Sequence, residues 1–440
     1  MRRILRAFIA CLPAALVFGQ TDAPKYTGPG SCASPACHGG VSPKDIGTGT
    51  RANIQQNEYS TWVVKDKHAR EFSVLTNPTA TRMAKILNID RADKAQKCLV
   101  CHSLSVTDEQ RTRSFDSSDG VSCESCHGPA SNWLGQHTTK DWTHERSVAA
   151  GMKDLRDPAH RTENCVSCHL GTADKTVDHE MIAAGHPDLY FELASFSAAM
   201  PEHWRPRATS ANAQGNVDPW ADVRALAVGQ AVHLREQLNR VARNAQSPHW
   251  PEFSDLDCYA CHHSLTTSEN SWQQERGYAG RRAGDPPWNM ARFATLRQIA
   301  REVDGGRELE TEVNRIYSSV TAMTAGRTQL ASQATGAAEA AGRVAAQLAT
   351  ETWDATRARR LLKAISGDAD YISRQGERTA EQAAMVLQAL YSALATQARP
   401  ANDAQVRGAL KALFQQVENP SAYNAFRFAA QMRTLNGLLP

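Results

Sequence analysis

Long apolar runs are missing from most of this 440-residue chain. Beyond the N-terminal stretch no segment reaches the roughly 18 apolar residues that a membrane-spanning helix needs, so we expect a soluble mature chain. An excess of one charge is missing too, because 49 Lys and Arg face 46 Asp and Glu. This balance argues against nucleic acid as a partner and leaves small charged patches for protein docking. Cysteine and histidine are absent from Trp288 onward, so we expect that this region has no chemistry of its own.

One five-residue pattern, Cys-x-x-Cys-His, occurs four times in the part of the chain that does contain cysteine. The cysteine pairs are Cys98 and Cys101, Cys123 and Cys126, Cys165 and Cys168, and Cys258 and Cys261; the histidines that follow them are His102, His127, His169 and His262. This pattern is typical of haem c attachment. The two thiols add to the vinyl groups of one porphyrin, and the adjacent histidine becomes an axial ligand of the iron.

Zinc sites and disulfides are the alternative explanations for paired cysteines. Neither explains why histidine follows the second cysteine each time. With 15 His in 440 residues, four coincidences have a chance on the order of one in a million, so haem is favoured.

A fifth pair, Cys32 and Cys37, precedes His38 with a spacing two residues longer than usual. Without Cys11, which lies in the N-terminal apolar stretch, the remaining ten cysteines form five pairs. A small disulfide loop is the alternative for this pair. The sequence predicts five molecules of haem c, four of them at regular sites.

The N-terminus resembles an export signal. Arg2, Arg3 and Arg6 precede an apolar run over residues 7–18, and small residues follow at 19–23. This run is too short to span a membrane. Lipidation at Cys11 is disfavoured because the apolar run continues past it. Haem c is attached outside the cytoplasm, so we expect a cleaved signal peptide and a periplasmic protein.

Five irons need sixth ligands, and histidines outside the motifs are the candidates. We select His68, His137, His179 and His186. For His68 a surface role is the alternative, and for the pair His179 and His186 the alternative is that one binds iron while the other only forms hydrogen bonds. His203 is a weaker candidate, His233 is as readily a core residue, and His144 is better explained as a surface residue.

Hydrophobic periodicity predicts helices over 54–67, 79–87, 221–245 and 400–420, and a capping box at Thr379 to Gln382 predicts a helix start. The expected fold class is mostly α with extensive loops, in which a multihaem cytochrome c domain precedes a helical bundle. The expected division is a signal peptide over 1–23, the haem domain over 24–276, a linker over 277–287 and a helical region over 288–440. That last region either packs on the haem domain or forms a homo-oligomer.

Residues 120–129, the surroundings of His68 and the segment 184–187 together resemble the cytochrome c-554 (c-554/c-prime) family, over roughly 28–263. The resemblance implies a mostly helical haem domain with stacked haem pairs, mainly His/His-ligated, that passes electrons between redox protein partners. Family members can have one five-coordinate haem. The long first spacing, the fifth haem and the C-terminal helices depart from the family.

An electron carrier has no catalytic residues, and none are assigned here. The alternative is a multihaem oxidoreductase that acts on nitrite, hydroxylamine or a related N-oxide at a five-coordinate haem. The chain lacks the Cys-x-x-Cys-Lys site typical of pentahaem nitrite reductases and has fewer attachment sites than hydroxylamine oxidoreductases. A subunit that polymerises through its terminal haems is a third alternative.

Overall fold

The structure is a computed structural model that describes residues 23–44, 54–205, 218–248, 250–258, 261–262, 286–322, 326–397 and 400–439. These residues are mostly helical, which confirms the expected fold class. Their only β-pairing is two isolated bridges, Tyr26 with Arg111 and Leu256 with Trp288. No helix in these ranges is long and apolar enough to cross a membrane. Most of the predicted signal peptide and linker lies outside the described residues.

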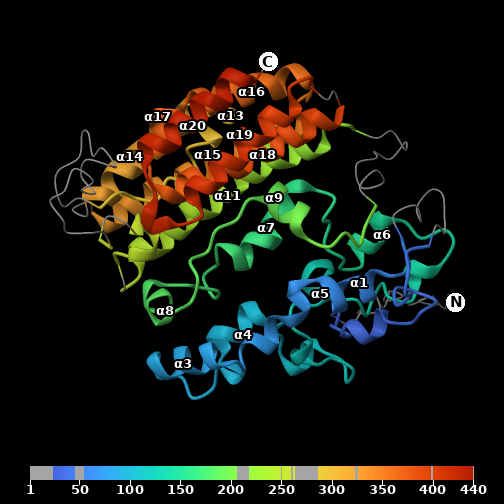
Figure 1. Ribbon diagram of the computed structural model, residues 1–440. Coiled ribbons are helices and arrows are strands. Elements are labelled where there is room, and N and C mark those ends of the chain that lie inside the picture. Colours follow the sequence, from blue (N-terminus) through green and yellow to red (C-terminus); the bar gives the residue numbers. More distant parts are fainter. Residues whose placement is uncertain are drawn as a thin grey trace, which may run out of the picture.

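The N-terminal half consists of short helices joined by loops and lies on one side of the molecule (Figure 1). The helices are α1 (Glu58–Lys65), α2 (Glu71–Val74), α3 (Pro78–Ile86), α4 (Gln96–His102), α5 (Cys123–His127), α6 (His144–Ala149), α7 (Pro158–His169), α8 (His179–Ala184) and α9 (Leu193–Ala199). Its hydrophobic clusters are small. One consists of Leu75, Ala84 and Ala92. This half therefore has little apolar core of its own within the described ranges.

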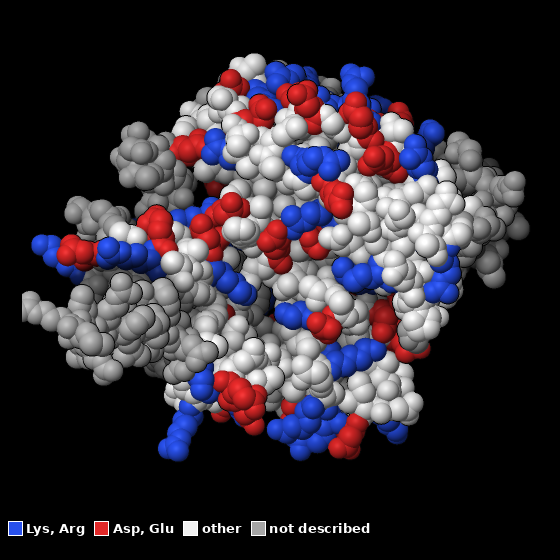
Figure 2. All heavy atoms as spheres, turned by 180° about the vertical axis from the view of Figure 1, so that it is seen from behind, with Lys and Arg blue, Asp and Glu red and all other residues white. Residues whose placement is uncertain are grey.

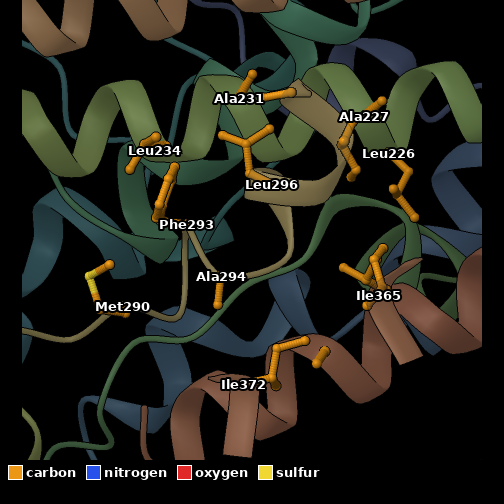
Figure 3. Packing of buried hydrophobic residues seen from close by; sticks show 14 of the residues in the cluster. Leu226, Ala227, Ala231, Leu234, Met290, Phe293, Ala294, Leu296, Ile365 and Ile372 are labelled. Atoms are coloured by element: carbon orange, nitrogen blue, oxygen red, sulfur yellow. The ribbon is translucent and has the colours of Figure 1, made fainter. Parts of the chain in front are cut away.

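The second half is a bundle of longer helices that lies across the first (Figure 1). Its members are α11 (Ala221–Gln246), α13 (Leu296–Ala300), α14 (Gly306–Ala322), α15 (Arg327–Thr350), α16 (Ala355–Gly367), α17 (Ala369–Arg374), α18 (Glu377–Gln397), α19 (Asp403–Val417) and α20 (Ala425–Leu438). Buried aliphatic and aromatic side chains from α11, α13, α16 and α17 meet in one large core (Figure 3). Helix α15 packs along α11 and contributes small buried residues such as Ala334 and Ala341.

Helix α11 therefore belongs to the core of the bundle, although its sequence position placed it in the predicted haem domain. It also packs against α7, which carries one of the attachment motifs. Burial of nearly its whole circumference, including Val228 and Val232, explains this double contact, because it leaves α11 no solvent-facing side there. Helix α11 thus packs against both halves of the chain.

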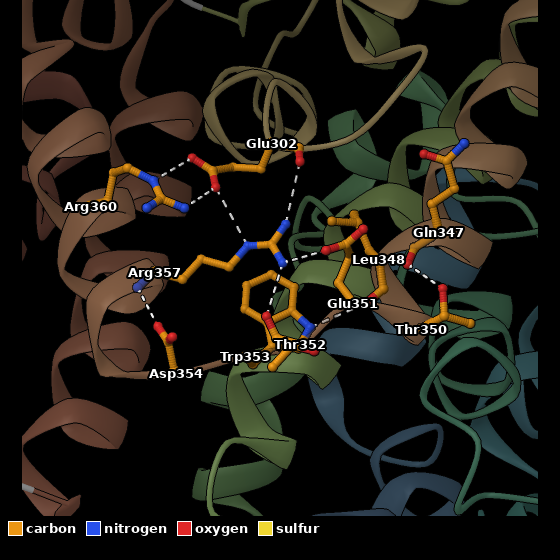
Figure 4. Close-up of polar contacts among 10 residues, drawn as sticks. All are labelled: Glu302, Gln347, Leu348, Thr350, Glu351, Thr352, Trp353, Asp354, Arg357 and Arg360. Atoms are coloured by element: carbon orange, nitrogen blue, oxygen red, sulfur yellow. Dashed lines mark hydrogen bonds and ion pairs between the residues drawn. The ribbon is translucent and has the colours of Figure 1, made fainter.

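A polar network fixes the loop after α13 to the start of α16 (Figure 4). The guanidinium of Arg357 donates to Glu351 at 2.8 Å and lies over the Trp353 ring at 4.5 Å from its centroid. The Glu302 carboxylate forms an ion pair with Arg357 at 3.5 Å and accepts a hydrogen bond from the Nε of Arg360 at 2.9 Å. These contacts stabilise the bundle and lie away from the cysteine motifs.

The predicted helix start at Thr379 is wrong. Helix α18 begins at Glu377, and the Thr379 hydroxyl, inside the helix, donates to the Gln375 carbonyl at 3.2 Å. Gly376 has φ 102°, a left-handed conformation that glycine adopts easily, and it separates α17 from α18 before Thr379 is reached.

On the face seen in Figure 2, basic and acidic side chains are intermixed, in keeping with the near-neutral total charge.

Candidate haem sites

Three of the four regular motifs form the C-terminal turns of helices. Helices α4, α5 and α7 end at His102, His127 and His169. In a helix, residues three and four apart lie on one face, so the two cysteines and the histidine of each motif point to the same side. After α5, Gly128 has φ 79° and turns the chain away. In the last motif, which is the fifth along the chain when Cys32 to His38 is counted as the first, the amide of His262 donates to the Cys258 carbonyl at 2.8 Å, which closes a single turn.

The longer first motif is folded into a tight loop. The amide of His38 donates to the Cys32 carbonyl at 3.2 Å, and the amides of Cys37 and Gly39 donate to Ser34 at 2.8 and 2.9 Å. A Cβ on Gly39 would lie 1.8 Å from the Ala33 carbonyl oxygen, so only glycine fits there. The two extra residues are thus taken up by a turn, and Cys32, Cys37 and His38 remain neighbours.

The ten cysteines outside the N-terminal stretch are free thiols, Cys32 and Cys37 included. Across the described ranges, no three His, Cys, Asp or Glu side chains gather in a way that could hold a metal ion. Within the described ranges Cys32 and Cys37 are not joined, and the grouping that a four-thiolate zinc site requires is not seen. A haem iron needs only two protein ligands, one on each side of the porphyrin.

Four histidine pairs come together, and each pair joins one motif histidine to one of the four candidates from elsewhere in the sequence. The centroid separations are 6.2 Å for His38 and His137, 6.3 Å for His68 and His169, 6.2 Å for His102 and His186, and 6.1 Å for His179 and His262. The chain thus places each of these four candidates opposite a different motif histidine.

This separation fits two imidazoles on one iron. Metal–nitrogen bonds are about 2 Å long, and ring bonds of about 1.35 Å put each nitrogen about 1.1 Å from the ring centroid, so the expected centroid separation is roughly 6.3 Å. The planes of the two rings can turn about the common nitrogen–iron axis. Any interplanar angle is compatible with this arrangement, and the observed angles are 9°, 90°, 83° and 27°, so the centroid separation alone carries the comparison. The residues present therefore fit haem c.

Five of these eight rings have a hydrogen-bond partner at Nδ1, which leaves Nε2 available for iron. Three partners are carboxylates: Glu58 to His38 at 2.9 Å, Asp66 to His68 at 3.0 Å and Glu71 to His102 at 3.0 Å. Two are backbone carbonyls: Trp133 to His137 at 3.2 Å and Pro187 to His186 at 2.8 Å. Such partners fix the tautomer and ring orientation of metal-binding histidines.

Burial and these partners also set the protonation of the rings. The hydrogen bond to Asp66 raises the pKa of His68, and the bond from His102 holds the pKa of Glu71 below its ordinary value. Burial lowers the pKa of His169 to about 4, which keeps its ring neutral with a lone pair for a metal. Sequence reasoning missed the three carboxylates. Asp66, two residues before His68, was visible, whereas Glu58 and Glu71 lie 20 and 31 residues from their histidines.

The remaining histidines differ in which nitrogen is engaged. His144 has its Nε2 at 2.9 Å from Asp154, and His233, fully buried, has its Nε2 at 3.2 Å from the Arg292 guanidinium. Neither is arranged as a ligand. His127 has no ring partner at the spacing of the four pairs among the described residues. His263 lies outside the described residues.

A buried carboxylate next to a motif cysteine organises the N-terminal segment. Glu124, 1% exposed, accepts hydrogen bonds from the amides of Thr27 at 2.9 Å, Gly28 at 2.7 Å and Ala130 at 2.8 Å. Gly28 has φ 81°, and a Cβ there would meet the Ser114 carbonyl at 3.0 Å. The bonds to Thr27 and Gly28 hold the segment before the first motif against the third, and the Cys123 side chain lowers the pKa of Cys32.

Residues 35–128 match the family model of cytochrome c554 and c-prime. The resemblance seen in the sequence is confirmed over this segment, which contains residues 120–128 and His68 but not the segment 184–187. The cytochrome c554 and c-prime segment includes Cys37, His38 and the second and third motifs, and ends directly after His127. No curated protein matches the chain, and no solved structure does. The match supports haem c, iron and an electron-transfer role of the c-type cytochromes.

Proposed function

We propose that this protein is a pentahaem c-type cytochrome of the periplasm that carries electrons between redox protein partners. The observation that carries the proposal is the set of four histidine pairs at 6.1 to 6.3 Å, each opposite a different attachment motif. Two histidines per iron leave no coordination position for a substrate, which suits transfer of electrons rather than catalysis.

Haem c supplies reversible one-electron chemistry when it is bound. The cysteines hold it covalently, the histidine pairs fix its two faces, and the Nδ1 partners orient the rings. The small apolar core of the N-terminal half supports this proposal, because a porphyrin there supplies the apolar volume that the side chains do not.

Contacts between the motifs support a linear order of sites. The first lies beside the third because Glu124 of the third motif accepts from the amides of Thr27 and Gly28, just before Cys32. The third and fourth are joined by Lys153, whose ammonium donates to the Ser125 carbonyl at 2.9 Å and to Asn164 of α7 at 2.6 Å. We place the second beside the fourth because the Cys101 side chain is the largest cause that lowers the pKa of Cys168 to about 5.

The fifth site follows the second through α8. His179, at the start of α8, lies opposite His262, and His186, just after the helix, lies opposite His102. Gly185, with φ 118°, ends the helix between them. In addition, Lys97 at the start of α4 donates to Asp178 at 2.9 Å. The proposed order is first, third, fourth, second, fifth.

The two ends of this order have exposed cysteines, which supports electron entry and exit there. Cys37 of the first site and Cys258 and Cys261 of the fifth are exposed, whereas the cysteines of the three middle sites are only partly so. We assign the surfaces around these two sites to docking of a donor and an acceptor protein.

The enzyme alternative rests on one observation. His127 lacks the paired ring that the other four motif histidines have within the described residues. A multihaem oxidoreductase that acts on nitrite, hydroxylamine or another N-oxide requires an open coordination position on the iron at this site.

The C-terminal helices are proposed to brace the haem domain through α11. A homo-oligomer formed through their outer faces is a further proposal.

Haem content and coordination test the proposed function. Purified holoprotein should contain five covalently bound haems by intact mass and by haem-to-protein ratio, and the His137→Ala variant should retain five while one iron becomes high-spin. The matched control, His144→Ala, should leave the spectrum unchanged because its Nε2 bonds Asp154. Fewer than five haems, or a His137→Ala spectrum identical to that of the parent protein, contradicts the proposal.

A further inference from the structure

A small polar cavity lies between the fourth and fifth motifs. Its lining includes Leu170, which directly follows His169 of the fourth motif. It also includes Ser254 and Asp255, which come just before Cys258 of the fifth. Other lining residues come from the segments on both sides of α8, from α11 and from the residues just before α13, and most of the lining is polar. The cavity therefore suits a charged or hydrogen-bonding group rather than the apolar face of a porphyrin.

Arg292 is a buried cation of this lining that forms no ion pair with a carboxylate of the described residues. Its side chain is 7% exposed. Its Nε donates to the Nε2 of His233 at 3.2 Å, and its Nη2 donates to the Leu189 carbonyl at 3.0 Å. Burial lowers the pKa of His233, so both acceptors are neutral. The Nη1 of Arg292 has no hydrogen-bond partner in the part of the chain that the structure describes, and burial lowers the pKa of Arg292 to about 10.

The acidic residues of the lining are engaged by other cations. Asp255 accepts from Arg240 at 2.7 Å, and Asp188 forms an ion pair with Arg378 at 3.0 Å. Of the charged groups around Arg292, these four act on it most strongly. A buried charge without a counter-ion is costly. The charge of Arg292 therefore favours an anion that enters the cavity from outside its lining.

Aromatic rings connect Arg292 to the haem site at the fourth motif. The Phe191 ring lies 5.2 Å from that of His169 and 5.9 Å from that of His233, between centroids. His233 is in turn the ring that accepts from Arg292. Every haem c carries two propionates, which are carboxylates on flexible arms at one edge of the porphyrin. Hydrogen bonds between a guanidinium and a carboxylate are among the strong ones in proteins, because both partners are charged.

We propose that Arg292 binds a carboxylate in this cavity, supplied by a propionate of the haem at Cys165 and Cys168 or by a free carboxylate ion. Either source neutralises the buried guanidinium. The propionate source rests on the proposed function, since it requires a haem at the fourth motif, and it would tie the edge of that haem to the C-terminal half of the chain.

The test compares the neutral Arg292→Gln with the charge-preserving Arg292→Lys in the full-length holoprotein. A buried propionate that loses its cation takes up a proton near neutral pH, and its ionised form stabilises oxidised iron. In Arg292→Gln the reduction potential of one haem should therefore fall as the pH rises through about pH 5–8. The parent protein and Arg292→Lys should lack this slope, because their propionate stays ionised. Arg292→Met, a second neutral variant that fills a similar volume, should behave as Arg292→Gln.

Acetate identifies the other source. A free carboxylate ion at Arg292 predicts that acetate raises the thermal midpoint of the parent protein and of Arg292→Lys but not of the neutral variants, and that no haem gains a pH slope. Neutral variants with five haems whose pH slope and acetate response both equal those of the parent overturn the inference. Failure of the proposed function gives a different result, a parent protein with no haem at Cys165 and Cys168 in a peptide map.

Discussion

His102 and His186 face one another with ring centroids 6.2 Å apart and planes at 83°. The first ends helix α4 and the second follows the left-handed Gly185 after α8. Their Nδ1 atoms bond Glu71 and the Pro187 carbonyl, which leaves the Nε2 atoms of both rings available for an iron. The ring separation recurs in three other pairs, at 6.1 to 6.3 Å, and is the basis of the electron paramagnetic resonance prediction below.

The carboxylate partner of His38 should tune a reduction potential. Glu58 accepts from Nδ1 at 2.9 Å and gives the ring partial anionic character, which stabilises oxidised iron. Glu58→Gln should raise the potential of one haem in a spectroscopic redox titration and leave the others in place. Glu180→Gln, which removes an exposed carboxylate beside His179, is the control. A lowered or unchanged potential in Glu58→Gln would mean that this bond does not tune the iron.

Glu124 should hold the N-terminal segment on the third motif. Glu124→Ala leaves the buried amides of Thr27, Gly28 and Ala130 without their acceptor, at a cost of about 1–3 kcal/mol for each unsatisfied group. We expect faster limited proteolysis within residues 24–44 and a reduced yield of the haem at Cys32 and Cys37. Glu180→Ala provides the exposed control, and equal proteolysis of the two variants would contradict the anchoring role.

Arg240 should stabilise the junction between α11 and the haem segments. Its guanidinium is buried and donates to Asp255 at 2.7 Å, to the Leu170 carbonyl at 3.2 Å and to the Val177 carbonyl at 3.3 Å. Arg240→Met leaves Asp255 buried without its charge partner, so we expect a loss of about 3–5 kcal/mol in the free energy of unfolding.

The control for Arg240 is Arg360→Met, which breaks an exposed ion pair with Glu302. Exposed pairs contribute at most about 1 kcal/mol. Denaturant unfolding followed by circular dichroism measures both variants, and similar losses in the two would show that burial of the Arg240 pair has no special effect.

Glu192 should make the stability depend on pH. Burial raises its pKa above the ordinary value of 4.5, against the opposing hydrogen bonds from the Ser195 and Ala194 amides. The folded state therefore binds the proton more tightly than the unfolded state, and the stabilisation is complete below pH 4.5 and is lost as the pH rises through the folded-state pKa. Glu192→Gln should flatten the loss of thermal stability above pH 4.5 relative to the parent. An identical pH profile in the variant would refute this.

The sequence was sufficient for the motif histidines because covalent attachment fixes their spacing. It also supplied four candidate partners, yet their pairing depends on contacts between residues far apart, such as His68 with His169, which no local pattern encodes. His179 and His186 lie seven residues apart, and they face different motifs because Gly185 ends the helix between them. The packing of α11 into the C-terminal bundle could not be predicted for the same reason, because its partners on α15 lie about a hundred residues later in the sequence.

The most direct test of histidine pairing is an electron paramagnetic resonance spectrum of the oxidised holoprotein with spin quantitation against haem. Near-parallel planes at His38/His137 and His179/His262, at 9° and 27°, should give ordinary rhombic low-spin signals. Near-perpendicular planes at His68/His169 and His102/His186, at 90° and 83°, should give low-spin signals of large g anisotropy. Equal amounts of the two kinds from these four haems support the account, whereas high-spin iron amounting to more than one haem per protein would contradict it.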